Sequence, residues 1–250
     1  SHSEETFCML CDHQVEMTSK SFQMGVRIEH PQKMIDECLL GRYSGHPLLS
    51  PCSYHLVSQK SDCAKQVCSF CMCPGGEIVP ATGTPGSLVT NGMSDYKRNS
   101  GFANAALVVT LNSEDFGKHH PLDGIGYRKK IEEDAFRRGG GDFTAPAQFA
   151  TDFLSKKAGK SRWISSYRLG LKEVPLERLL PAVITQSLRV ALPQFESKIK
   201  GFCSEGILLA PETRASCPVR IPRDQETMQS SSCKNLYPVG EGAGFAGGIV

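Results

Sequence analysis

The sequence has no hydrophobic run near the length of a bilayer span, since its best apolar stretch, residues 105–111, is strand-sized. Surplus charge is also small, because 28 Lys and Arg stand against 26 Asp and Glu. A net charge of +2 gives no electrostatic argument for nucleic acid or an anionic membrane as a partner. Residues 1–5 resemble neither a secretory signal nor an Arg-rich transit peptide. We therefore expect a small-molecule substrate.

Cysteine, by contrast, is abundant. The chain has 11 cysteines, an odd number, and four of them lie in one short segment (Cys63, Cys68, Cys71 and Cys73). A secreted disulfide scaffold would be shorter and would spread its cysteines over the whole chain. We therefore expect reduced thiols and an intracellular protein, in the cytoplasm or in an organelle such as a plastid. The remaining composition, 40% hydrophobic and 22% charged, is typical of one large or two small globular domains.

The N-terminal half has patterns of a helix, a longer strand, a loop and several short strands. Ser1 and Glu4 match a capping box, which predicts a helix from the first residue; because independent chains seldom begin this way, we expect a missing N-terminal part. Residues 25–30 alternate apolar and charged side chains, which predicts a half-buried strand, and residues 41–65 are typical of a loop. Short, mostly antiparallel strands are predicted at residues 77–79, 88–90 and 105–111, with a turn at Asn91 and Gly92.

The C-terminal half is first helical and then returns to strands and turns. Helices are predicted at residues 124–138, 146–154 and 176–192, the last with a bend or restart at Pro181. Strands are predicted at residues 207–209 and 236–239. The second of these runs into a glycine-rich end in which Gly242, Gly244 and Gly247 match the dinucleotide fingerprint. Glycine lets backbone N–H groups approach a ligand, and the alternative is a flexible tail.

Five blocks of sequence occur in an order that is typical of one family. They are residues 25–32 (GVRIEHPQ), 70–76 (FCMCPGG), 89–94 (VTNGMS), 218–221 (PVRI) and 237–250 (YPVGEGAGFAGGIV). Together they span nearly the whole chain and resemble the uncharacterised FAD-dependent (NAD(FAD)-utilising) dehydrogenase family. The resemblance implies an FAD-dependent oxidoreductase that transfers hydride or electrons through the flavin, with an unknown substrate and with NAD(P)H as a candidate electron donor.

The resemblance also implies a two-domain α/β fold. A partial Rossmann-like FAD domain would carry an inserted substrate domain built of a mainly antiparallel sheet and helices. Residues 1–20 would be the edge of the FAD domain, residues 21–200 the insert, and residues 201–250 the returning, truncated segment. The family's N-terminal Gly-x-Gly-x-x-Gly unit, which binds the ADP half of FAD, has no counterpart here. The resemblance therefore implies a fragment that holds FAD weakly by itself.

Cofactor-binding residues follow from the resemblance by position. Glu241 would accept hydrogen bonds from ribityl or ribose hydroxyls, beside glycines that let the backbone pass close to the cofactor. A helix opened by Gly247 would aim its N–H groups at the flavin N1–C2=O edge, which is negative in the reduced flavin. The full predicted set is Gly240, Glu241, Gly242, Gly244, Gly247, Gly248 and Ile249.

The cysteine cluster has three interpretations. Its four thiols suffice for zinc or an iron–sulfur cluster, but the Cys71-x-Cys73 spacing is poor for a zinc knuckle. Only Cys71 and Cys73 fall within a family-like block, where they are either small packing residues or thiols near the flavin, activated by a positive neighbour. Cys71 and Cys73 are therefore the candidate catalytic residues, and we predict no metal.

Other candidates are charged residues near these blocks. Arg214 and Arg220 are candidates for holding an anionic substrate, with structural ion pairs as the alternative. His30, which alternates with Arg27 and Glu29 in the predicted strand, is a candidate general base or a structural histidine. Two rival functions are a flavin-dependent RNA-modifying enzyme, which the small net charge disfavours, and a non-catalytic metal- or cofactor-binding module centred on the cysteines.

Overall fold

The computed structural model describes residues 3–117, 119–156 and 164–245, and the chain forms two compact units. Unit 1 comprises Ser1–Met24, Thr110–Lys130 and Thr213–Val250, and unit 2 comprises Gly25–Val109 and Ile131–Glu212. The three-part division into FAD-domain and substrate-domain segments stays a prediction. Within the described residues, every helix is too short or too polar to cross a membrane.

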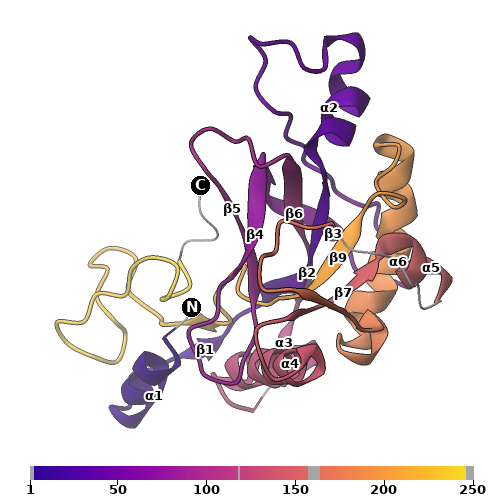
Figure 1. Ribbon diagram of the computed structural model, residues 1–250. Helices are drawn as coiled ribbons and strands as arrows, with labels where there is room; N and C mark the ends of the chain where they lie inside the picture. The colour runs from indigo at the N-terminus through magenta and orange to yellow at the C-terminus, as the bar shows by residue number, and fades with distance from the viewer. Residues whose placement is uncertain (1–2, 118, 157–163, 246–250) are drawn as a thin grey trace. The chain divides into compact units, whose positions relative to one another are not determined.

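Unit 2 is built on a mixed six-stranded sheet (Figure 1). Its order is β3 (Val67–Pro74), β6 (Phe102–Leu111), β2 (Phe22–Pro31), β9 (Ile207–Glu212), β7 (Ala145–Phe149) and β8 (Leu171–Glu173). The pairs β3–β6, β2–β9 and β7–β9 are antiparallel, and β7–β8 is parallel. The mixed α/β class with a mainly antiparallel sheet is confirmed.

The central strand β2 is buried on both faces, so the expectation of a half-buried strand is wrong. Val26 and Ile28 on one face are fully buried, and so are Arg27 and Glu29 on the other, at 0% and 1% exposure. A two-stranded ribbon, β4 (Gly76–Pro80) with β5 (Thr90–Ser94), covers the Arg27 face (Figure 1). The period-two alternation therefore reflects two buried faces of different chemistry, one apolar and one charged.

The other face of β2 is covered by helix α6 (Ala182–Lys198) through a group of aromatic rings. The ring of Phe202 lies 4.6 Å from that of His30 and 5.7 Å from that of Phe195 on α6. The restart predicted at Pro181 within residues 176–192 is confirmed, because a 3-10 turn at Leu176–Arg178 ends before Pro181 and α6 begins after it. Proline is readily accommodated at a helix start, where its missing N–H costs no hydrogen bond.

Two further predictions for unit 2 are wrong for the same physical reason. Asn91 and Gly92 lie inside β5, paired with Val79 and Ile78, and do not form a turn. Residues 146–149 belong to β7, so the predicted helix begins only at α5 (Ala150–Ser155). Pairing with the preceding strand β4 in the first case, and with the distant strand β9 in the second, overrides the local pattern. The remaining helices of unit 2 are α2 (Gln32–Leu40) and the 3-10 turn Gly41–Tyr43.

Helix α4 (Asp123–Gly139), which matches the predicted helix at residues 124–138, runs from unit 1 into unit 2. Unit 1 also contains α1 (Glu4–Asp12), α3 (Ser113–Phe116) and the pair β1 (Thr18–Ser19) with β10 (Val219–Arg220). Its core consists of Phe7, Val15, Met17, Ile125, Cys217, Val219, Ile221 and Ala243.

Two predictions in unit 1 are corrected. The first helix starts at Glu4 with Ser3 as its N-cap, and Ser1, the predicted cap, lies outside the described residues. The predicted strand at residues 236–239 is extended chain outside any sheet. Pro238 has no N–H to donate, and Tyr237 and Val239 are 55% and 69% exposed, so this segment has neither the donor nor the burial of a strand.

Candidate functional site

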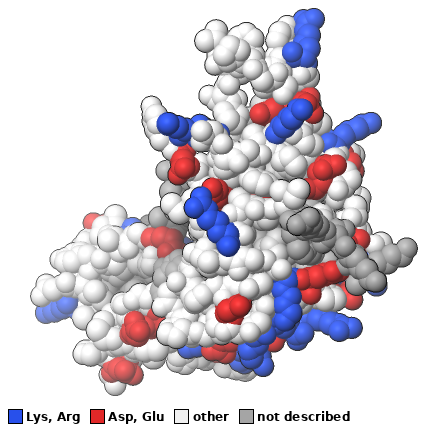
Figure 2. Space-filling view, viewed as in Figure 1, with Lys and Arg blue, Asp and Glu red and all other residues white. Residues whose placement is uncertain are grey.

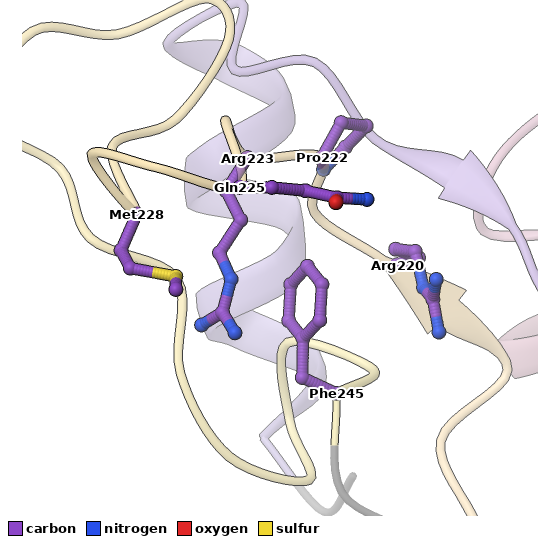
Figure 3. Close-up of a pocket in the computed structure, with 6 residues that line it drawn as sticks. All are labelled: Arg220, Pro222, Arg223, Gln225, Met228 and Phe245. Atoms are coloured by element: carbon purple, nitrogen blue, oxygen red, sulfur yellow. The ribbon is translucent and has the colours of Figure 1, made fainter.

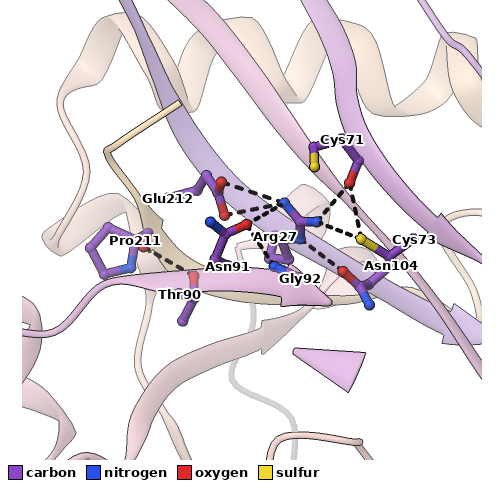
Figure 4. Close-up of polar contacts among 9 residues, drawn as sticks. All are labelled: Arg27, Cys71, Cys73, Thr90, Asn91, Gly92, Asn104, Pro211 and Glu212. Carbon is purple, nitrogen blue, oxygen red and sulfur yellow. Dashed lines mark hydrogen bonds and ion pairs between the residues drawn. The ribbon is translucent and has the colours of Figure 1, made fainter. Parts of the chain in front are cut away.

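A fully buried arginine lies at the centre of unit 2 (Figure 4). Its Nε donates to Asn104 Oδ1 at 2.8 Å, and its Nη2 donates to the Cys71 carbonyl oxygen at 2.7 Å. Nη2 also lies 3.4 Å from Cys73 Sγ, and Nη1 lies 3.4 Å from both carboxylate oxygens of Glu212. We call Arg27, Cys71, Cys73, Asn104 and Glu212 the Arg27 centre.

Two local features shape the Arg27 centre. The β3–β6 register shifts between Phe70 and Cys73, and Cys71 has a φ of 46°, in the left-handed region. This bulge directs the Cys71 carbonyl toward the guanidinium, as bulges commonly redirect groups beside functional sites. A Cβ at Gly92 would lie 2.1 Å from Arg27 Nη2 and 2.2 Å from Asn104 Oδ1. Gly92 is therefore required by close packing, not by a turn.

The Arg27–Glu212 ion pair lies in a region from which water is excluded. Burial raises the pKa of Glu212 to about 7, and the neighbouring Arg27 only partly opposes that rise. The carboxyl group therefore gains and loses its proton near neutral pH. A buried ion pair that lost one partner would leave an uncompensated charge, which is strongly destabilising.

The two thiols of the Arg27 centre have opposite acidities. A hydrogen bond with the Cys73 side chain lowers the pKa of Cys71 to about 6, with the charge of Arg27 acting in the same direction against burial. The same hydrogen bond and burial raise the pKa of Cys73. Cys71 is half-buried, whereas Cys73 is 8% exposed. Lowering the pKa favours the thiolate, which is the nucleophilic and electron-donating form of cysteine.

The other two cysteines of the cluster do not join this site. Cys63 is exposed near a short bridge between Ser61 and Ala64, and Cys68 is directed toward the Val108 carbonyl oxygen at 4.0 Å. Burial raises the pKa of Cys68. Among the described residues, no three His, Cys, Asp or Glu side chains are grouped as metal ligands.

The glycine-rich end of unit 1 brings together some of the predicted cofactor residues. Gly240 and Gly244 both have left-handed φ values, +76° and +82°. A Cβ at Gly240 would meet open space, whereas one at Gly244 would lie 2.6 Å from the Val219 carbonyl oxygen. Glu241 is half-buried between them, and the Gly242 carbonyl oxygen accepts from the Cys217 thiol at 3.4 Å. The predicted residues Gly247, Gly248 and Ile249 lie outside the described part of the chain.

A cavity of about 500 Å³ lies beside this segment (Figure 3). The guanidiniums of Arg220 and Arg223 lie 5.0 Å and 3.8 Å from the centre of the Phe245 ring, which stands between them. Arg220 also donates to the Gly244 carbonyl oxygen at 3.0 Å. Arg214, the other predicted arginine, is 9% exposed and does not line this cavity. Arg223 was not predicted from the sequence, although it stands in the same Pro- and Arg-rich segment.

The remaining sequence candidate, His30, lines a second cavity in unit 2 together with Glu29. Glu29 accepts hydrogen bonds from the backbone N–H and the hydroxyl of Ser166. His30 Nε2 lies 2.8 Å from the Phe202 carbonyl oxygen, and burial lowers the pKa of His30 to about 4. Asn91, Asn104 and Glu212 were missed because no local pattern distinguishes them from other strand residues.

Comparison with known protein families identifies the family to which this chain belongs. The family described as FAD-dependent protein, C-terminal domain-like, matches residues 21–215, and the chain belongs to it. The predicted dependence on FAD is thus confirmed at the level of the family. The match contains the whole Arg27 centre, whereas residues 216–250, with the glycine-rich end, lie beyond it.

Among curated proteins, the chain is similar to one from Clostridium beijerinckii named "Uncharacterized protein". The two are 43% identical over 253 residues, which cover 99% of this chain and 47% of the relative. The chain therefore spans about half the length of the curated relative that it matches.

Proposed function

We propose that this chain is part of an FAD-dependent oxidoreductase of the dehydrogenase type, in which Cys71 is the reactive thiol. The observation that carries the proposal is the family match over residues 21–215, a range in which the buried guanidinium of Arg27 lies against the Cys71 carbonyl oxygen and the Cys73 sulfur. FAD, when bound, supplies two-electron acceptance and donation. The charge of Arg27 would stabilise a thiolate at Cys71, and the Cys73 thiol donates a hydrogen bond to the Cys71 carbonyl oxygen.

The glycine-rich end of unit 1 fits a flavin nucleotide in two respects. The open space beside Gly240 lets a ligand approach the backbone, and Arg220 and Arg223 present positive charge in a cavity of about 500 Å³. Planar guanidinium groups suit the phosphate oxygens of a nucleotide. Glu241 would accept hydrogen bonds from the sugar hydroxyls. We further propose NADH or NADPH as the electron donor, by which the reduced flavin is formed.

The test is an absorption spectrum of the purified full-length protein, recorded with and without NADH or NADPH. We expect the visible bands of oxidised flavin, and their bleaching by one of the two nicotinamide cofactors in the absence of air. A colourless protein that takes up no FAD on incubation would refute the proposal. Flavin bands that neither cofactor bleaches would support the assignment as a flavoprotein and exclude NADH and NADPH as its electron donors.

Replacement of Glu241 tests the cofactor assignment separately. Glu241→Ala should lower FAD occupancy by about tenfold, because a charge-assisted hydrogen bond is lost. Glu226→Ala is the matched control, since Glu226 is an exposed glutamate of the same unit. Equal FAD occupancy in the two folded variants would remove Glu241 from the site.

A further inference from the structure

A second cavity, of about 230 Å³, lies in unit 2 where β2 ends. Phe102, Phe149, Ile164 and Ile207 form its apolar walls. Ile164 is 78% exposed, which is unusual for a large apolar side chain at the edge of a cavity. The walls therefore suit a small ligand with an aromatic or branched aliphatic body. We call this space the Glu29 cavity.

The polar groups of the Glu29 cavity are mainly acceptors. Glu29 is 1% exposed, and Ser166 donates two hydrogen bonds to its carboxylate, which fixes the orientation of the group. A carbonyl oxygen only accepts, so the contact with Phe202 places the proton of His30 on Nε2 and leaves a lone pair on Nδ1. That Nδ1 is buried and has no hydrogen-bond partner among the described residues.

The charge of the cavity is negative. Glu205, an exposed second carboxylate, also lines it, and none of the described lining residues is Lys or Arg. Burial raises the pKa of Glu29, and the groups that act on it further are Ser165, Ser166 and another carboxylate, Glu77. A buried carboxylate that is held by hydrogen bonds alone is costly, and a cationic ligand would offset that cost.

We propose that the Glu29 cavity binds a small primary amine with an apolar body, whose ammonium group is held by Glu29. An ammonium carries three donors, and the two carboxylates that line the cavity, Glu29 and Glu205, are acceptors for it. A carboxylate ligand would be repelled, and a neutral alcohol would lack the charge that Glu29 selects. The inference does not depend on the proposed flavin chemistry, because it concerns binding alone.

The first experiment is calorimetric titration of the full-length protein with benzylamine, benzyl alcohol and benzoate near neutral pH. The three probes share one ring and differ in charge. We expect benzylamine to bind at least about tenfold more tightly than benzyl alcohol, and benzoate not to bind. Benzylamine affinity equal to or below that of benzyl alcohol would overturn the proposal.

Variants locate the binding. Glu29→Gln keeps an oxygen that can accept from Ser166 but removes the charge. It should weaken the binding of benzylamine about tenfold and leave the affinity for benzyl alcohol unchanged. Glu37→Gln on the exposed face of α2 is the matched control and should bind as the parent does. Unchanged benzylamine affinity in a folded Glu29→Gln protein would overturn the proposal.

Ile164→Lys guards against a Glu29 variant that does not fold. Ile164 is largely exposed, so its replacement should leave the fold intact. A cation at this position should weaken the binding of benzylamine at least about threefold and leave the affinity for benzyl alcohol nearly unchanged. If neither Ile164→Lys nor Glu29→Gln alters benzylamine binding, the amine does not occupy this cavity.

Discussion

The Arg27 centre of unit 2 and the glycine-rich end of unit 1 are built in opposite ways. Around Arg27, the partners come from three other strands, β3, β6 and β9, and the contacts with Cys71, Asn104 and Glu212 join residues 44, 77 and 185 positions apart. At residues 240–245 the side-chain hydrogen bonds from Cys217 to Gly242 and from Arg220 to Gly244 join residues 25 and 24 positions apart, and Gly240 faces open space. The properties of the buried cluster therefore depend on strand pairing. Those of the glycine-rich segment depend more on residues that are close to it in the sequence.

Surface charge gives a second contrast with the Arg27 centre. On the face shown in Figure 2, basic and acidic side chains are interspersed, as the counts of 28 and 26 lead one to expect. Exposed pairs such as Lys33 with Glu37 contribute little to stability, because water screens them. The strongest electrostatic effects should therefore come from the few buried charges, and the predictions below test that difference.

The largest effect is expected for Arg27→Met. It leaves Glu212 buried without its cation, and should lower the free energy of unfolding by about 3–5 kcal/mol. Arg178→Met, at an exposed position, should change it by less than about 0.5 kcal/mol. Urea denaturation of both variants measures the difference. Similar losses in the two would show that the Arg27 centre contributes no special stability.

The next effect is a pH dependence due to Glu212. Its pKa is raised to about 7 in the folded protein, so its protonated form favours folding. This stabilisation is complete below the unfolded pKa of about 4.3 and is lost as pH rises through about 7, on the order of 3 kcal/mol in all. The unfolding free energy of the parent minus that of Glu212→Gln should therefore fall over this range. A difference that is flat with pH would contradict the assignment.

Two glycine replacements compare the regions directly. In Gly92→Ala the new methyl group meets the hydrogen-bonded guanidinium of Arg27, and we expect a loss of about 2–3 kcal/mol. In Gly240→Ala the methyl group has room, and only the left-handed φ of +76° opposes it, at about 1 kcal/mol. Thermal or urea unfolding measures both losses. Equal losses would mean that the side chains around Arg27 rearrange freely.

The smallest effect concerns thiol reactivity. Iodoacetamide should modify one cysteine of the parent quickly, with a rate that reaches half its maximum near pH 6, and Cys71→Ala should remove this fast phase. Cys73→Ala deletes the hydrogen bond that lowers the pKa of Cys71, and should slow the phase about tenfold at neutral pH. Cys68→Ala is the control and should not change it. A fast phase that survives Cys71→Ala would make Cys71 a packing residue.

Several elements were predictable because their patterns are local. The charged helix α4 and the apolar strand β6 agree closely with the predicted residues 124–138 and 105–111, since periodicity within one segment decides both. Residues 146–149, Asn91 and Gly92 were predicted incorrectly, because pairing with another strand, β9 or β4, determines their structure. The same limit applied to the site, where the cysteines stood out in the sequence but Arg27 could be assigned no partner.

The sequence by itself determined the family, the mixed α/β class and the choice of Cys71 and Cys73 as candidate residues, because these depend on residue identity and local order. Only the tertiary structure decided which thiol lies against the guanidinium of Arg27, why Gly92 must lack a side chain, and that Arg27 and Glu29 lie buried on one face of β2. The physical reason is that acidity and close packing depend on neighbours across the sheet. Those neighbours are brought together by strand pairing, and their spacing along the chain does not reveal it.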